Sequence, residues 1–192
     1  MVDKATVKQL SELSLTMFRK NFFGIYHGAI SAKLDQENFL INTNDAIFDE
    51  MSSSSFCTLN LNKQDYRWQI ASMESHIHAT IYSNIHEAKY IAFGMPIYTT
   101  AYTFDHDSIV FEDYFGKTTF NEIPIYDPGD CKTWYDRNAL EITKYLKQSV
   151  NNVMVIKGVG AYVYDRDINE LVKKIAILEN SCRLLSIKTS FC

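Results

Sequence analysis

The chain of 192 residues carries a formal net charge of −4 and is 46% hydrophobic, which is enough to bury the core of one domain and too apolar for general disorder. Charged residues make up 22% of the chain and are interspersed. Without a basic run there is no track for phosphates, so we expect no nucleic-acid partner. No stretch approaches the about 18 apolar residues of a membrane span, and the N-terminus has no secretion signal. We therefore expect no membrane association and a cytoplasmic location.

The N-terminal part of the chain has helical and then alternating apolar patterns. Helical spacing predicts an amphipathic helix over residues 4–20. Alternation over residues 24–34 favours a strand, which residues 38–43 would join as a hairpin, and residues 56–61 favour a third strand. Apolar residues three and four apart then predict one continuous helix over residues 68–83. They are Ile70, Met73, Ile77 and Ile81.

The C-terminal part interleaves short apolar segments with two further helices. The segments that favour strands are residues 89–93, 108–111, 121–125, 153–156 and 161–164. Thr133, with Asp136 three residues later, is typical of the start of a helix that reaches about Gln148, and Asp167 with Glu170 is typical of the start of the last helix. This interleaving predicts a single α/β domain over residues 1–192, layered and with a mixed sheet.

His76 and His78 are the first candidates for a metal site. On the predicted helix, residues two apart point in nearly opposite directions, so this pair does not form a joint site. Glu74, His78 and Tyr82 share one helix face because they are four residues apart. They are either a carboxylate–imidazole pair at a pocket or a polar seam between packed elements.

His27 and Lys157 each have two interpretations. His27 alternates with Ala29 and Ser31, so it faces either a site or solvent. Lys157 ends a buried strand, a place where α/β proteins often build sites, or its ammonium extends to water. The sequence contains no G-x-S-x-G, P-loop or G-x-G-x-x-G motif.

Several motifs in order resemble the class II aldolase and adducin N-terminal family. The segments that match are HGAIS from His27, LINTN from Leu40, SME from Ser72 with His78 after it, KYIAFGMP from Lys89, IPIYDPG from Ile123 and VIKGV from Val155. The resemblance covers nearly the whole chain. It implies a layered α-β-α domain with a central mixed, mainly antiparallel sheet, and homotetramers, which family members commonly form.

The resemblance also assigns site residues. In the family, a catalytic zinc is held by two histidines of a His-x-His motif and a third from Asn-His-Gly, and a glutamate acts as acid and base. Glu74 stands at the glutamate position. The resemblance places Ala92 and Gly94 at the His-x-His positions and Lys157 at the third histidine. None of these supplies a zinc ligand, so we expect no metal and no cofactor.

The phosphate pocket of the family is partly retained. Thr43 and Ser72 remain as donors, Asn44 replaces a glycine, and His27 lies beside them in the motif. Ala29 and Met73 replace two further donors. The resemblance therefore implies a weakened pocket for a small sugar phosphate.

Three functions remain open. The first is a binding or assembly protein without zinc-dependent aldolase activity, as in adducin-type relatives. The second is an aldehyde-lyase or epimerase with a non-standard zinc site, built from Glu74, His27 and His78. The third is metal-free chemistry that uses Glu74 and Lys157 as catalytic residues. A separate hypothesis is that Lys157 takes the place of the metal and pairs with the buried Glu74 carboxylate. A sharper version makes Lys157 a Schiff-base nucleophile.

Overall fold

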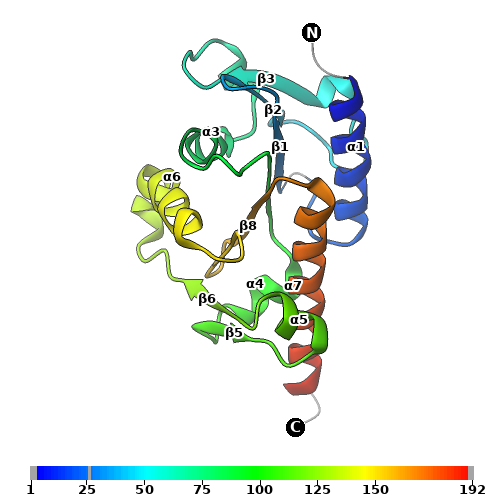
Figure 1. The fold of residues 1–192 in the computed structure, drawn as a ribbon, viewed down its shortest axis with the longest axis vertical. Coiled ribbons are helices and arrows are strands. Elements are labelled where there is room, and N and C mark those ends of the chain that lie inside the picture. The colour runs from blue at the N-terminus through cyan, green and yellow to red at the C-terminus, as the bar shows by residue number, and fades with distance from the viewer. Residues whose placement is uncertain (1–3, 26, 190–192) are drawn as a thin grey trace.

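The computed structural model describes residues 4–25 and 27–189, in which seven α-helices and eight strands alternate along the chain (Figure 1). The helices are α1 Lys4–Arg19, α2 Arg67–Ile70, α3 Ser75–Asn84, α4 Ile97–Tyr102, α5 Tyr114–Thr119, α6 Cys131–Gln148 and α7 Ile168–Thr189, with one 3-10 turn at Ser53–Ser55. The strands are β1 Ala29–Lys33, β2 Asn38–Asn42, β3 Phe56–Asn60, β4 Tyr90–Gly94, β5 Ser108–Val110, β6 Glu122–Tyr126, β7 Val153–Ile156 and β8 Gly160–Asp165.

The strands form one eight-stranded sheet in the order β3-β2-β1-β4-β8-β7-β6-β5. Neighbouring strands are antiparallel except β6 and β7, which are parallel. The β1–β2 hairpin is present as the sequence predicted, with Ser31 opposite Ile41. The expected mixed, mainly antiparallel sheet is therefore confirmed.

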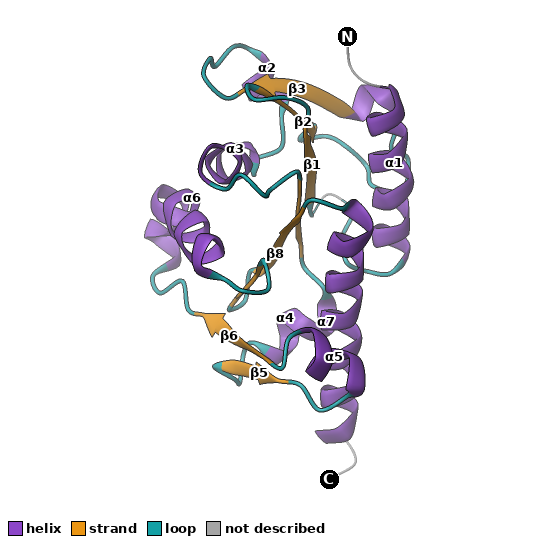
Figure 2. Ribbon diagram, viewed as in Figure 1, coloured by secondary structure: helices purple, strands orange, loops and turns teal. Residues whose placement is uncertain are grey.

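Two helical layers cover the two faces of the sheet (Figure 2). On one face, α1 and α7 pack on a core that includes Leu10, Ile30, Ala92 and Val163. On the other face, α3 and α6 pack on a second core that includes Ile81 and Tyr162. The apolar stripe that predicted the helix over residues 4–20 is buried in the first core, and so is the stripe of α7 with Leu171, Ile175 and Leu178, since an amphipathic helix hides its apolar face from water. The layered α-β-α arrangement is confirmed.

The helix predicted over residues 68–83 is wrong in one respect, because it is broken in two. Ala71 is extended with ψ 161° and forms an isolated bridge with Thr43. The Ser72 N–H then donates to the Asn42 carbonyl at 2.9 Å. The end of β2 therefore binds the chain at residues 71 and 72, and this tertiary pairing outweighs the local helical periodicity.

Helix starts also differ in part from the predictions. Asp130 caps α6, because its carboxylate accepts from Lys132 N at 2.9 Å, so Thr133 is not the cap. Asp167 does precede α7, and its carboxylate accepts from Asn169 N at 2.7 Å. The short helices α4 and α5 were not predicted, because six residues are too few for a period to be recognised.

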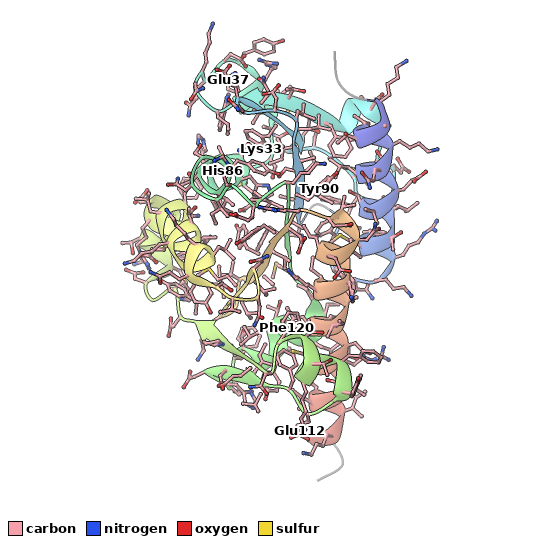
Figure 3. The ribbon with its side chains drawn as sticks, viewed as in Figure 1. Lys33, Glu37, His86, Tyr90, Glu112 and Phe120 are labelled. Carbon is pink, nitrogen blue, oxygen red and sulfur yellow. The ribbon has the colours of Figure 1, made fainter. Side chains whose placement is uncertain are left out.

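α7 extends past the sheet at its C-terminal end. There Lys188 pairs with Glu112, labelled in Figure 3, at 2.7 Å. Within residues 4–25 and 27–189, no helix combines the length and the apolar character needed to cross a membrane.

Candidate functional site

A cavity of about 170 Å³ opens where the ends of β1, β2 and β4 meet the start of α3. Five of the six site residues predicted from the sequence line it: His27, Thr43, Asn44, Ser72 and Glu74. Gly28, Asn42, Ala46, Phe48, Met73 and Phe93 complete the lining. Lys157 is not part of it.

A larger groove of about 700 Å³ lies beside the β1–β2 hairpin, with Lys33, Arg67 and Lys89 in its wall. All three side chains have partners, and the Lys89 ammonium lies 5.4 Å from the centroid of the Tyr90 ring. Arg67 pairs with Asp65 at 2.6 Å, and the Lys33 ammonium donates to the Tyr82 carbonyl at 2.9 Å. Because none of the predicted site residues reaches this groove, we place the candidate site in the smaller cavity.

The polar side of the cavity is built by two loop segments that the Thr43–Ala71 bridge holds together. The Asn42 amide accepts from Ile30 N at 2.9 Å and donates to the Thr43 carbonyl at 3.1 Å. The Ser72 hydroxyl accepts from Glu74 N at 3.3 Å. Sequence reasoning missed Asn42, although a polar residue at the end of an apolar strand was a usable signal.

Glu74 immediately precedes α3 and forms the wall between the cavity and the second core. Its carboxylate accepts a hydrogen bond from the Tyr162 hydroxyl on β8. Burial raises the pKa of the Glu74 carboxyl, and the bond from Tyr162 opposes that rise. Burial and the nearby Glu74 carboxylate together raise the pKa of Tyr162, so its hydroxyl stays protonated as the donor.

His78 and Tyr82 belong to a separate buried chain. His78 Nδ1 lies 2.7 Å from the Ser31 hydroxyl, which lies 2.7 Å from the Tyr82 hydroxyl. Burial lowers the pKa of His78 to about 3, so the ring is neutral. The polar-seam interpretation therefore holds for these two residues, while Glu74 faces the cavity. His76 is exposed and packs on Trp68, so the expected splay of His76 and His78 is confirmed.

The residues of β4 that face the site differ from those that the resemblance indicated. Ala92 is fully buried in the core beneath α1 and α7, and a Cβ on Gly94 would lie 2.5 Å from the Phe22 carbonyl oxygen. Phe93 lines the cavity instead. Gly160 shares a face of β8 with Tyr162, and a Cβ on Gly160 would lie 3.2 Å from Met95 Cγ, so the Met95 side chain lies on that face too. The assignment of Ala92 and Gly94 to the His-x-His positions was therefore one residue out of register. Phe93 and Met95 occupy the site side.

Lys157 lies in the turn between β7 and β8, where its ammonium is 3.7 Å from an Asp107 carboxylate oxygen. The predicted pair of Lys157 with Glu74 is not formed, because Glu74 is bonded to Tyr162. Lys157 and Glu74 thus have different partners in the structure.

The donor set does not fit the zinc centre that the resemblance implied. Phenylalanine has no donor atom, a thioether is a poor zinc ligand, and a lysine ammonium repels a cation. Within the described part of the chain, no three His, Cys, Asp or Glu side chains gather closely enough to hold a metal ion. The alternative shell of Glu74, His27 and His78 is therefore not assembled.

Comparisons with known proteins identify the family and the fold. The family model described as "Class II Aldolase and Adducin N-terminal domain" matches residues 8–186. No curated protein is similar enough in sequence to count as a relative.

Solved structures with the same fold are distant in sequence. L-fuculose-1-phosphate aldolase from Thermus thermophilus superposes with a TM-score of 0.85 at 17% identity, covering 96% of this chain and 94% of that one. A sugar-phosphate aldolase from Thermotoga maritima gives 0.76 at 15% identity, covering 98% and 96%. The N-terminal class II aldolase domain of a conserved protein from Thermoplasma acidophilum gives 0.68 at 11% identity, covering 96% and 95%. At these identities the superpositions establish the fold.

Proposed function

This chain belongs to the class II aldolase and adducin N-terminal domain family, and from that premise we propose that it binds a small sugar phosphate without zinc-dependent aldolase activity. The observation that carries the proposal is the contrast between the two sides of one cavity. Thr43, Asn44 and Ser72 supply polar groups on one side, while Phe93 occupies the other. A phosphate needs such donors, and a zinc ion needs ligands that Phe93 does not supply.

The energetics of aldol chemistry support the loss of that activity. In the zinc enzymes, the metal polarises the carbonyl and stabilises the enediolate. Glu74 alone would supply general acid–base help, which is worth about 10²–10⁴-fold. Typical enzymes reach about 10⁶-fold or more, so the carboxyl by itself leaves most of the barrier in place.

A second candidate function is metal-free lyase or epimerase chemistry on the same class of ligand. It is favoured by one observation, the raised pKa of a carboxyl that lines the cavity, since a general base works best with a pKa near the working pH. Lys157 would join this chemistry only after leaving Asp107. Turnover of a sugar phosphate by metal-free protein, abolished in Glu74→Gln, would favour this candidate.

We further propose that residues 1–192 form a single cytoplasmic domain that assembles into homotetramers. The family match over residues 8–186 supports the single domain. Exposed apolar side chains on α5 and after α4 are compatible with subunit contacts: Phe104 is 61% exposed, Tyr114 74% and Phe115 64%. Sedimentation analysis of the full chain tests the assembly, and a monomer at micromolar concentration would reject it.

The function is tested by metal content and calorimetry on tagless protein made in zinc-supplemented medium. We expect far less than one zinc per chain, together with binding of inorganic phosphate and dihydroxyacetone phosphate. Ser72→Ala and Thr43→Val should each weaken phosphate binding about tenfold, since hydrogen bonds to a charged group contribute about 1.5–3 kcal/mol. One metal per chain, or no binding of either ligand, would reject the proposal.

A further inference from the structure

Tyr162 is the residue that distinguishes this site from a metal centre. Its ring is buried, with 2% exposure, and is stacked on Phe93 with 4.6 Å between the ring centroids. His78 lies at its edge, 6.5 Å away and at 71°. Held between these two rings, Tyr162 donates its hydroxyl hydrogen to the Glu74 carboxylate.

Glu74 therefore has two different environments on its two sides. On the inner side it accepts from Tyr162, and on the outer side it lines the cavity beside Ser72 and His27. A carboxylate whose inner oxygen is bonded keeps acceptor capacity on the outer side. Among the described residues, no lysine or arginine lines this cavity, so a second negative charge next to Glu74 would meet no cation.

We propose that Tyr162 is a positioning residue that makes Glu74 a hydrogen-bond acceptor for a hydroxyl group of the ligand. The inference rests on the proposed function and specifies its ligand class: a phosphate ester with a neutral hydroxyl next to Glu74, rather than a carboxylate or enediolate. A metal ion in this place would favour the opposite class, because it attracts anionic oxygens. Here a ligand carboxylate would lie next to the Glu74 carboxylate, and the repulsion between these like charges weakens its binding.

Two probes of similar size separate these classes. Glycerol 3-phosphate offers hydroxyl groups, and phosphoglycolate offers a carboxylate. At pH 8, calorimetry should give about tenfold tighter binding of glycerol 3-phosphate, which corresponds to about 1.4 kcal/mol of discrimination. Tyr162→Phe should reduce this ratio, because Glu74 becomes easier to protonate. Glu74→Gln should remove or invert it, because an amide can donate to a carboxylate.

Tyr164→Phe is the matched control, since Tyr164 lies two residues away on β8 and is buried in the same core. It should leave the ratio unchanged. A direct readout is the pKa of the Glu74 carboxyl, followed by carbon NMR: it should rise in Tyr162→Phe and stay constant in Tyr164→Phe. Tyr162 is bonded to Glu74, His27 lines the same cavity, and the neutral His78 packs on the Tyr162 ring. The comparison therefore reports on the Tyr162 bond.

Equal or tighter binding of phosphoglycolate would overturn the ligand class. An identical Glu74 pKa in wild type and Tyr162→Phe would overturn the positioning role. Failure of the proposed function is distinguishable, because the protein would then bind neither probe nor inorganic phosphate. In that case the ligand class would also be rejected, while the NMR comparison would still decide the role of Tyr162.

Discussion

Phe93 and Tyr162 are direct partners across β4 and β8, and their rings stack on the side of the sheet where Tyr162 bonds to Glu74. This one pairing fixes which residues of β4 can reach the site. Successive side chains of a strand point to opposite faces, so Ala92 and Gly94 lie on the other side. The site side of the strand ends with Phe93, and Met95 follows it.

Histidines at positions 93 and 95, which face the site, should create a metal site. In the triple variant Phe93→His, Met95→His and Lys157→His, two imidazoles lie on the site side at the end of β4 and the third comes from the β7–β8 turn, and we expect it to bind about one zinc or cobalt ion per chain. Cobalt absorption and elemental analysis measure this. We expect the matched variant Ala92→His, Gly94→His and Lys157→His to lose its fold, because a Cβ on Gly94 approaches the Phe22 carbonyl at 2.5 Å. A folded, metal-binding form of this second variant would contradict the register.

The sequence was sufficient for most of the fold, because long periodic segments such as residues 4–20 and the stripe of α7 bury one face each. It also identified Thr43, Ser72 and Glu74, which lie together in the cavity. It failed where distant segments decide the outcome. Ala71 is extended and forms a bridge with Thr43, and the hydroxyl of Tyr162 donates to Glu74, which lies 88 positions earlier in the chain. Neither contact leaves a local pattern, and an ungapped motif match cannot resolve a shift of one residue on a strand.

Glu74→Gln should stabilise the protein at neutral pH and leave it unchanged at low pH. The folded-state pKa of Glu74 is raised above 4.5, the value of an exposed group. Folding therefore favours the protonated acid, and stability is lost as the pH rises from about 4.5 through the folded-state pKa. A neutral glutamine avoids that loss.

Thermal unfolding at pH 4 and pH 8 tests the expectation. A gain of about 1 kcal/mol would raise the midpoint by about 2–4 °C in a protein of this size. Glu170→Gln, an exposed carboxylate on α7, is the control and should have no comparable effect. A midpoint that falls at pH 8 would mean that the Tyr162 bond outweighs the burial of the charge.

His78 should make the protein sensitive to acid. Its folded-state pKa is about 3, against 6.5 for an exposed imidazole, because it is fully buried. The unfolded chain takes up a proton below about pH 6.5 and the folded chain does not, so stability falls as the pH drops through this window. One proton contributes a slope of up to about 1.4 kcal/mol per pH unit.

The slope is measured by urea unfolding between pH 7 and pH 5. In His78→Gln the slope should decrease by the contribution of about one proton, which is up to about 1.4 kcal/mol per pH unit. This variant is less stable at pH 7, because the hydrogen bond between Ser31 and residue 78 is altered. His86→Gln, an exposed histidine labelled in Figure 3, should keep the wild-type slope. Equal slopes in wild type and His78→Gln would show that His78 is accessible to protons in the folded protein.

Glu179 should be essential for the position of α4. Its buried carboxylate accepts from Tyr98 N at 3.0 Å, from Thr99 N at 2.8 Å and from the Thr99 hydroxyl at 2.8 Å. Glu179→Ala leaves these donors without their acceptor, and we expect a loss of about 2–4 kcal/mol in the free energy of unfolding. Glu179→Gln keeps one acceptor oxygen and should lose less. Glu170→Ala on the same helix, whose carboxylate is 52% exposed, should change it by less than about 0.5 kcal/mol.

The position of α4 matters for the site because the helix begins directly after Met95 and Pro96, which leave β4 on the site side. If Glu179 holds that turn, Glu179→Gln should weaken phosphate binding in the folded protein as well as lower its stability. Calorimetry at a temperature where the variant stays folded separates the two effects. Unchanged phosphate affinity in a destabilised Glu179→Gln would mean that α4 stabilises the fold without shaping the cavity.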